Sequence, residues 1–450
     1  MVNVIKVKKG LDIHLKGKAP EVLLTTTSRS DSYAVVPDSF QGIVPKVVVK
    51  TGEKIKAGSV LMTDKNRPEI KFVSPVSGEV TAVHRGEKRK VLRIVVTPHE
   101  GIEYETFGVK DPSVLEAEEI KEALLEAGIW PFITQRPYDI VASPADTPRD
   151  IFISTTYTAP LSPDFGFIVK NREADFQTGL NALAKLTPGH VYVGIKKGSP
   201  RKWSGVEMIE VEGPHPAGNV SVLINHTKPI NKGEIVWTIR PDDVIIAGRL
   251  FRKGIADFSR LVALTGSETA RRGYISAIDG CTIRSLVEGT LPEGKASVRI
   301  ISGNVLTGKK VSPDDYLYAS DNQITVIPEG DQTHEFFGWA MPGIGKFSVS
   351  RTFPAWLLGK KKEYVIDARI RGGKRAMIMS NEYDKVFPMD IYPEFLLKAI
   401  IAFDIDKMEN LGIYEVAPED FALCEFVDTS KIEIQQIVRK GLNLLHKEMN

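Results

Sequence analysis

The sequence predicts a multidomain protein of mixed α/β and α+β class. Three patterns support this prediction: short strands broken by glycine and proline in the first hundred residues, a strand–helix–strand pattern in the middle, and helical periodicity near the end. At roughly 150 residues per domain, a chain of 450 residues holds about three domains or slightly more. We place the boundaries at 1–100, 101–255, 256–330 and 331–450.

Composition describes a globular chain without a strong charge. Hydrophobic residues make up 42% and charged residues 26%, which argues against disorder. The net charge is +2, which argues against nucleic acid as a partner. No uncharged apolar run reaches the length of a membrane helix, and residues 1–17 lack the apolar core and cleavage site of a signal peptide. We therefore expect a soluble protein of the cytoplasm.

The cysteines and histidines of the sequence do not indicate a metal site. Cys281 and Cys424 are the two cysteines, so we expect no disulfide framework and a reducing compartment. An iron–sulfur cluster with four thiolate ligands cannot be built from this chain alone. The eight histidines form no pair at helical spacing and lie beside no cysteine cluster, so the sequence predicts no zinc site.

Residues 1–100 indicate a barrel-sandwich segment of the biotinyl/lipoyl type. Two half-motifs, 47–61 and 72–83, each combine valine-rich strands with tight glycine turns. In a lipoyl domain the modified lysine projects from a hairpin between the halves, which is where Lys65 stands here. A carrier function at Lys65 is therefore an alternative, but we prefer a structural barrel with an exposed lysine.

Residues 101–255 predict a Rossmann-like α/β domain. A capping box at Ser113–Glu116 indicates a helix that ends at Gly128. Further on, strand 151–154, a helix with the apolar stripe Phe176, Leu180 and Leu183, and strand 191–195 form a βαβ unit.

The first strand of that unit lacks the signature of a dinucleotide site. No G-x-G-x-x-G follows it, and Thr155-Thr156-Tyr157 would crowd a pyrophosphate. The sequence therefore predicts a dinucleotide-type fold without a working nucleotide site.

Residues 256–330 predict a small β-grasp-like module with strands at 298–302 and 323–328. Between these strands, Gly303–Lys309 matches a phosphate loop for seven positions, but Lys310 replaces the required serine or threonine. The hydroxyl that would hold Mg²⁺ is missing, so we expect a β-turn with lysines.

The last region, 331–450, combines an aromatic-rich linker with helices. Phenylalanines, tryptophans and prolines gather in segment 334–360, and lysines follow at Lys360–Lys362. This segment either pins a long loop to the body or docks on an integral-membrane partner. From Tyr392 onward the chain predicts helices, and a capping box at Ser430–Glu433 precedes an apolar stripe of Ile434, Ile437, Val438, Leu442 and Leu445.

Segments in matching order along most of the chain resemble the NqrA family, which supplies one subunit of the bacterial Na⁺-translocating NADH:quinone reductase. They are Gly128–Pro131, Arg136–Tyr138, Gly194–Ile195, Gly338–Trp339, Pro342–Gly343, Gly372–Met377, Pro388–Ile391, Leu411–Gly412 and Ala422–Cys424. The wider relatives of this family are the flavin subunit of respiratory complex I and the electron-entry subunit of the Rnf complex. The resemblance implies the barrel-sandwich segment, the Rossmann-like domain, a β-grasp module of the soluble-ligand-binding (SLBB) type, and C-terminal helices.

The resemblance also implies a function. It indicates a peripheral subunit on the cytoplasmic side of the bacterial inner membrane, in an assembly with integral-membrane subunits that oxidises NADH, reduces quinone and exports Na⁺. NADH, FAD, FMN and iron–sulfur clusters are expected in other subunits, and this chain is expected to hold no tight cofactor, although quinone contact has been attributed to it.

Where the wider relatives hold a cluster in their helical end, this chain offers only Cys424, and it lacks their glycine-rich flavin loop. We therefore assign no catalytic, cofactor-binding or metal-ligating residue. Two rival functions stay open: an Rnf-type electron-transfer subunit, and a lipoyl or biotin carrier modified at Lys65.

The aromatic segment yields a test of membrane docking. Replacing Phe336, Trp339 and Trp356 together with serine removes apolar rings that a docking surface would bury, so the variant is expected to leave the membrane assembly. The measurement is the amount of this chain that sediments with native membranes. Retention at the wild-type level would contradict docking through this segment.

Overall fold

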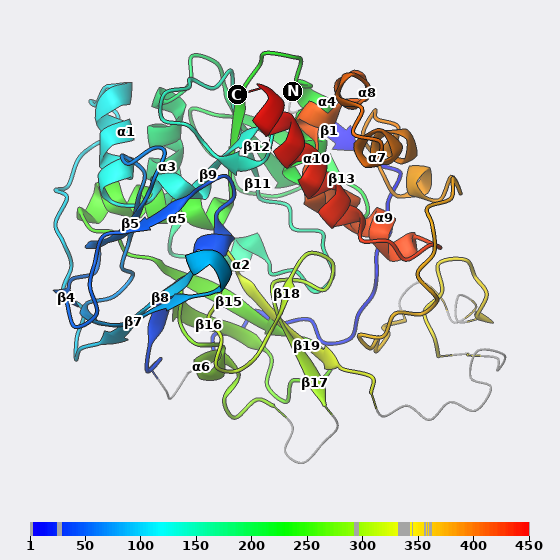
Figure 1. Cartoon of the computed structure of the whole chain (residues 1–450), viewed down its shortest axis with the longest axis horizontal. Coiled ribbons are helices and arrows are strands. Elements are labelled where there is room, and N and C mark those ends of the chain that lie inside the picture. Colours follow the sequence, from blue (N-terminus) through cyan, green and yellow to red (C-terminus); the bar gives the residue numbers. More distant parts are fainter. Residues whose placement is uncertain are drawn as a thin grey trace.

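The structure is a computed structural model. It describes the whole chain except residues 1–2, 25–28, 292–296, 332–342, 344, 355–356, 358, 360–361 and 450. Phe336, Trp339 and Trp356 of the proposed docking segment therefore lie outside the described residues. Across the described residues the strands form four sheets, with helices packed around them (Figure 1).

Two small antiparallel sheets form the segment after residue 32. One has the order β2 (Tyr33–Val35), β8 (Val91–Pro98), β7 (Gly78–Arg85) and β4 (Lys54–Ile55), and the other β3 (Pro45–Val47), β5 (Val60–Asp64) and β6 (Lys71–Val73). Val80, Ile94 and Val96 are buried between the sheets. A side chain at Gly78 would place its Cβ 2.1 Å from the Thr97 carbonyl oxygen, so the strand crossing requires glycine. This architecture is the predicted barrel sandwich.

The first 24 residues of the predicted segment 1–100 contact other parts of the chain. Strand β1 (Asn3–Lys6) pairs in parallel with β13 (Glu207–Glu212) in the large sheet. Leu23 then bridges Tyr274 of the β-module (residues 256–330). Ile5 and Val7 are buried, so the alternating start of the chain fills the edge of a sheet that is formed far away in the sequence.

The large sheet has seven strands. Its order is β1, β13, β12 (Val191–Lys196), β11 (Ile151–Ser154), β14 (Val236–Ile239), β9 (Ile133–Arg136) and β10 (Ile140–Val141). The first five run parallel, whereas β9 and β10 are antiparallel to their neighbours. The predicted βαβ unit is confirmed, because β11 and β12 are parallel neighbours joined through α3 (Glu173–Lys185).

Helices α2 (Phe165–Val169), α4 (Val220–Thr227) and α5 (Pro241–Lys253) complete this domain. Two glycines let α3 and α5 approach closely. A Cβ on Gly248 would lie 1.7 Å from the Asp175 carbonyl oxygen, and one on Gly179 would lie 2.2 Å from that of Val244. Backbone contact replaces side-chain packing at this crossing.

Helix α1 (Ala117–Glu126) corrects the predicted start at Ser113. The residue before the helix is Glu116, whose backbone N–H donates to the Glu119 carboxylate at 2.9 Å. Glu116 and Glu119 thus form the capping box, while the backbone N–H of Ser113 donates to Asp111 in a local turn. The end is as predicted, because Gly128 adopts a left-handed φ of +65°.

The β-module has a five-stranded sheet and helix α6 (Ile283–Val287). The order is β16 (Gly273–Ile278), β15 (Ser259–Thr265), β19 (Gln323–Pro328), β17 (Val298–Ser302) and β18 (Lys309–Val311). Strands β17 and β19 have the predicted bounds. The predicted turn is confirmed, because β17 and β18 form a hairpin in which Asn304 Oδ1 accepts hydrogen bonds from the N–H groups of Leu306 and Thr307.

The C-terminal unit comprises α7 (Pro393–Ile401), α8 (Ile405–Asn410), α9 (Ala422–Val427) and α10 (Ile434–Met449). The predicted stripe on α10 is confirmed, with Ile434, Val438, Leu442 and Leu445 fully buried. The capping box at Ser430–Glu433 is wrong: Ser430 donates to the Ala376 carbonyl at 2.9 Å, and Glu433 pairs with Lys374 at 2.8 Å. Short 3₁₀ turns occur at Pro37–Ser39, Glu87–Arg89, Trp130–Phe132, Tyr383–Lys385, Ile413–Glu415 and Pro418–Phe421.

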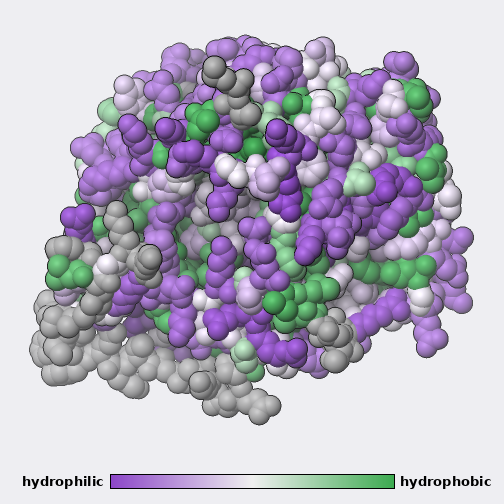
Figure 2. All heavy atoms as spheres, turned by 180° about the vertical axis from the view of Figure 1, so that it is seen from behind, coloured by the Kyte–Doolittle hydropathy of each residue, from purple (hydrophilic) through white to green (hydrophobic). Residues whose placement is uncertain are grey.

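Two hydrophobic cores hold these parts together. The larger joins the barrel sandwich, the α/β domain and the β-module, and the smaller joins β1, β13 and α4 to the C-terminal helices. In Figure 1 these helices, orange to red, gather where β1 and β13 lie. The face drawn in Figure 2 is mostly hydrophilic, with apolar side chains in small groups. Within the described chain, none of the helices combines the length and apolarity needed to span a bilayer.

Candidate functional site

A small apolar cavity of about 40 Å³ lies where the barrel sandwich, the α/β domain and the β-module meet. We call it the junction cavity. Four phenylalanine rings, Phe40, Phe72, Phe132 and Phe258, line it together with Leu317 and Asp279. The ring centroid of Phe40 lies 4.9 Å from that of Phe72 and 5.5 Å from that of Phe132, both nearly edge-on. Aromatic walls beside one carboxylate are typical of sites for planar, weakly polar ligands.

Residues 128–132 form the wall that the α/β domain contributes to the junction cavity. Trp130 is fully buried, its indole N–H donates to the Ala142 carbonyl at 2.9 Å, and its ring meets Trp237 edge-on at 5.2 Å. Gly128 makes this approach feasible, since a Cβ there would lie 2.7 Å from the side chain of Val73. The short turn Trp130–Phe132 is thereby held against β6, and Phe132 faces the cavity.

A buried ion cluster lies behind the cavity. Arg260, on β15, is 1% exposed and contacts Asp279 through both Nε and a terminal nitrogen, the latter at 2.6 Å from Oδ2. The same guanidinium donates to Asp243 of α5 at 2.9 Å, and Ser320 donates to the other oxygen of Asp243 at 2.8 Å. One arginine therefore joins the α/β domain to the β-module.

Burial shifts the pKa of both acids in this cluster. It raises the pKa of Asp279 to about 6, although Arg260 and its hydrogen bonds act in the opposite direction. The pKa of Asp243 is also raised by burial. Because Asp279 lines the junction cavity, a buried carboxyl group with a raised pKa stands beside the apolar walls.

A second feature is the position at the carboxyl ends of β11 and β14, where open α/β sheets commonly have a ligand-binding crevice. Here Tyr157 donates to Asp242, and Asn322 of the β-module donates to the same carboxylate oxygen at 3.0 Å. Arg240 donates to the carbonyl of Ser320 at 2.9 Å. The loop Ser320–Asn322 thus closes the crevice.

The chemistry of this crevice does not suit a phosphate. Asp242 and Asp243 occupy the first turn of α5, the position where a helix N-terminus would receive an anionic ligand. On the other side, Thr155 donates to the Gly194 carbonyl at 2.8 Å, and a Cβ on Gly218 would lie 1.9 Å from the Thr156 carbonyl oxygen. A flavin or nicotinamide dinucleotide therefore does not fit the residues at this edge.

The C-terminal unit is held to the α/β domain by charged contacts. Arg439 of α10 pairs with Asp139 and donates to the Tyr138 carbonyl at 3.0 Å, while Asn219 donates to Asp420 at 3.0 Å. Burial, helped by Asp420, raises the pKa of Glu419 to about 7. This contact therefore carries an acid that titrates near neutral pH.

Lys65, the candidate carrier lysine, has an exposed side chain in the loop between β5 and β6. The loop is tied to the body: Asp64 accepts from the Val44 N–H at 3.0 Å and pairs with Arg67, whose guanidinium donates to the Val141 carbonyl at 3.0 Å. The geometry favours the structural interpretation of this hairpin.

The two cysteines are buried, free and in different cores. Burial raises the pKa of the Cys281 thiol to about 12 and also raises that of Cys424. Among the residues that the structure describes, no group of His, Cys, Asp and Glu is arranged to hold a metal ion.

Sequence analysis missed the ion cluster. Two signals were present: an arginine inside an otherwise apolar strand (Ser259–Thr265), and paired aspartates at the start of a helix. Their partner Asp279 precedes Gly280, and an Asp-Gly pair indicates only a turn. Sequence alone does not indicate that these three charges meet.

Three domain models of one family match the chain in order. The "NqrA N-terminal barrel-sandwich hybrid domain" matches residues 5–99, the "NqrA second alpha/beta domain" residues 115–256, and the "NQRA C-terminal domain", an SLBB model, residues 261–312. They confirm the predicted barrel-sandwich segment and SLBB-type module.

Similar proteins extend over the full length. The chain is 36% identical to the A subunit of the Na(+)-translocating NADH-quinone reductase of Neisseria meningitidis serogroup A, over 99% of this chain and 100% of that protein. Proteins of the same name from Pasteurella multocida and Yersinia pestis bv. Antiqua are each 35% identical with the same coverage. Among solved structures, a chain of an NAD⁺-reducing [NiFe]-hydrogenase in the H₂-reduced state matches with a TM-score of 0.37 and 12% identity, over 48% of each chain.

The ion cluster yields a stability prediction. Asp279→Ala leaves Arg260 buried with only one carboxylate, so the free energy of unfolding in urea is expected to fall by about 3–5 kcal/mol. The control is Asp314→Ala, because its pair with Arg284 has side chains 79% and 56% exposed, and it is expected to cost about 0–1 kcal/mol. Equal losses in the two variants would show that the cluster does not hold the domains together.

Proposed function

The chain belongs to the NqrA family, the A subunits of Na⁺-translocating NADH-quinone reductases. From this premise we propose that it is a structural subunit without a tightly bound redox cofactor, and that it contributes to the quinone site. It is one component of a Na⁺-translocating NADH:quinone oxidoreductase, an oxidoreductase assembly that reduces quinone with NADH and moves Na⁺. Within that assembly, the proposal concerns what this chain itself supplies.

We propose that the chain carries no tight redox cofactor. The observation on which this rests is the acidic first turn of α5, since the carboxylates of Asp242 and Asp243 occupy the helix N-terminus where a phosphate would bind. The buried cysteines with raised thiol pKa values add support, because cluster ligands must be thiolates. NADH, FAD, FMN and iron–sulfur clusters would then belong to other subunits, and the isolated chain would not be catalytic.

We further propose where the chain stands in the assembly. As part of a complex classed as a translocase, it would bind integral-membrane subunits from the cytoplasmic side of the bacterial inner membrane, as a peripheral protein. The Rossmann-like domain and the β-grasp module would then be the parts of the chain that contact these subunits.

The junction cavity is our candidate for quinone contact. Four phenylalanine rings can stack on a quinone ring, and Asp279, which Arg260 holds through both carboxylate oxygens, adds a polar group to the cavity wall. At about 40 Å³ the cavity holds little more than a water molecule, so a ring enters only if a side chain such as Phe40 moves.

The cofactor content of the isolated chain tests the proposal that it holds no redox cofactor and no group attached to Lys65. The chain isolated after mild extraction is expected to show no visible absorption from flavin or clusters and an unmodified mass at Lys65, whereas detergent-solubilised native membranes should yield it with the other subunits. Tightly held FMN or NADH on the isolated chain would defeat the proposal and favour the Rnf-type alternative. A lipoyl or biotinyl adduct would favour the carrier alternative.

Quinone contact has its own test in the assembled complex. Photolabelling with an azido-quinone is expected to mark peptides around Phe40 and Phe132, and Ala319→Leu, which fills the cavity, is expected to remove most of this label. The control is Ala123→Leu on α1, another half-buried alanine, which should leave labelling unchanged. Label that persists in Ala319→Leu would place quinone elsewhere.

A further inference from the structure

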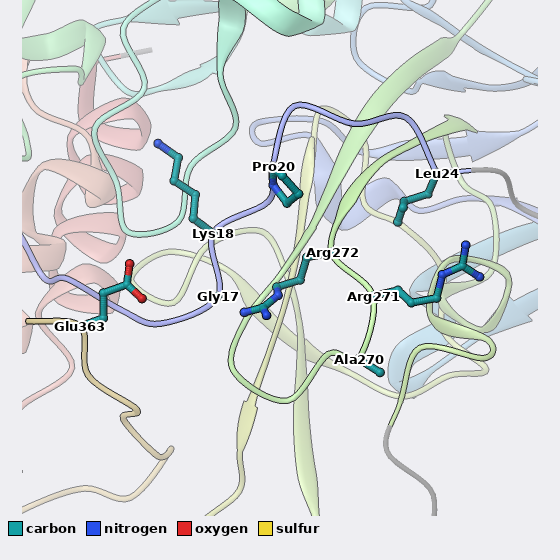
Figure 3. Close-up of a pocket in the computed structure, with 8 residues that line it drawn as sticks. All are labelled: Gly17, Lys18, Pro20, Leu24, Ala270, Arg271, Arg272 and Glu363. Atoms are coloured by element: carbon teal, nitrogen blue, oxygen red, sulfur yellow. The ribbon is translucent and has the colours of Figure 1, made fainter.

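A second hollow, an open cleft of about 560 Å³, lies away from the junction cavity on the β-module. Its walls come from residues 17–24, from loop 270–272 before β16, and from Glu363 (Figure 3). Lys18, Arg271 and Arg272 give it three cations against the single carboxylate of Glu363. We call it the basic cleft.

These cations differ from most arginines of the protein. Arg260 and Arg299 contact carboxylates at 2.9 Å and 3.0 Å, respectively. Within the part of the chain that the structure describes, the side chains of Lys18, Arg271 and Arg272 have neither an ion pair nor a hydrogen bond. Arg272 is half-buried, and its five guanidinium donors have no acceptor among these residues.

The walls of the cleft are held by backbone contacts. The Leu24 N–H donates to the Tyr274 carbonyl at 2.7 Å, and the Tyr274 N–H donates to the Val22 carbonyl at 2.8 Å, so this segment lies along the edge strand β16. At its other end the Gly266 N–H donates to the Gly17 carbonyl at 2.8 Å. A Cβ on Gly17 would lie 2.2 Å from the Gly266 carbonyl oxygen, which fixes the close crossing.

The side chains extend from this frame in different directions. In Figure 3 Arg272 extends toward Gly17, whereas Arg271 extends toward Leu24. Lys18 extends away from both arginines, so the cations are distributed along the cleft.

We propose that the basic cleft binds a phosphate group. A guanidinium presents two parallel donors that match phosphate oxygens, and a lysine adds a mobile point charge. The volume lies within the range of ligand sites. Beside the cleft, Val22 and Leu23 are 54% and 57% exposed. If the phosphate belongs to a lipid headgroup, the acyl chains of that lipid can contact these apolar side chains.

The experiment uses the full chain and two probes. The first is inorganic phosphate, and the second is vesicles of phosphatidylglycerol and phosphatidylcholine compared with vesicles of phosphatidylcholine alone. Binding is measured for the wild type and for Lys18→Gln/Arg271→Gln/Arg272→Gln. The matched control is Arg85→Gln/Lys88→Gln/Arg89→Gln, which removes the same charges from exposed positions of the barrel sandwich.

The wild type is expected to bind at least one probe, with affinity that falls as salt rises. The cleft variant is expected to bind at least about tenfold more weakly, because each cation near an anionic surface contributes roughly fivefold. Binding of inorganic phosphate identifies a soluble ligand, and binding of the anionic vesicles alone identifies a lipid headgroup; both support the site.

The proposal is overturned if neither probe binds, or if the control variant loses as much affinity as the cleft variant. Thermal unfolding of each variant checks that the fold is intact. Should Arg272→Gln destabilise the protein, Lys18→Gln/Arg271→Gln, which changes only exposed side chains, takes its place with the same expected direction.

Discussion

The arrangement of the domains depends on the burial of one positive charge. Arg260 is removed from water, and this is tolerable only because Asp243 and Asp279 reach it from two different domains. Gly280, which follows Asp279, extends this connection to a third domain. Its carbonyl oxygen accepts a hydrogen bond from the Ala34 N–H at 2.8 Å, and a Cβ on Gly280 would lie 2.2 Å from the Ala34 carbonyl oxygen. The α/β domain, the β-module and the barrel sandwich are thus linked through a few adjoining atoms.

This linkage lies beside the junction cavity. The aromatic walls of the cavity are supplied by different domains, and Asp279 of the charged contact lines the same cavity. Apolar side chains alone tolerate many packings, whereas a paired guanidinium has few acceptable geometries. Asp243, together with its neighbour Asp242, also fills the N-terminus of α5 with acidic side chains. The first turn of α5 is therefore used here to hold domains together.

The sequence predicted those features that are encoded by neighbouring residues. The stripe on α10, the βαβ unit around Ile151–Ser154 and strands β17 and β19 all follow from short-range periodicity bounded by turns. The helix start at Ser113 was wrong because Glu116 and Glu119 offer a competing capping box three residues later. Strand β1 and the Arg260 cluster could not be predicted, because their partners are set by tertiary packing and leave no periodic signal.

The pairing of β1 with β13 has a consequence for how the chain matures. Some two hundred residues separate the partners, and every strand of the barrel sandwich lies between them. While the polypeptide emerges from the ribosome, at about 5–20 residues per second, the barrel sandwich is complete well before β13 is available. For that interval of at least several seconds, Ile5 and Val7 have no sheet edge to join.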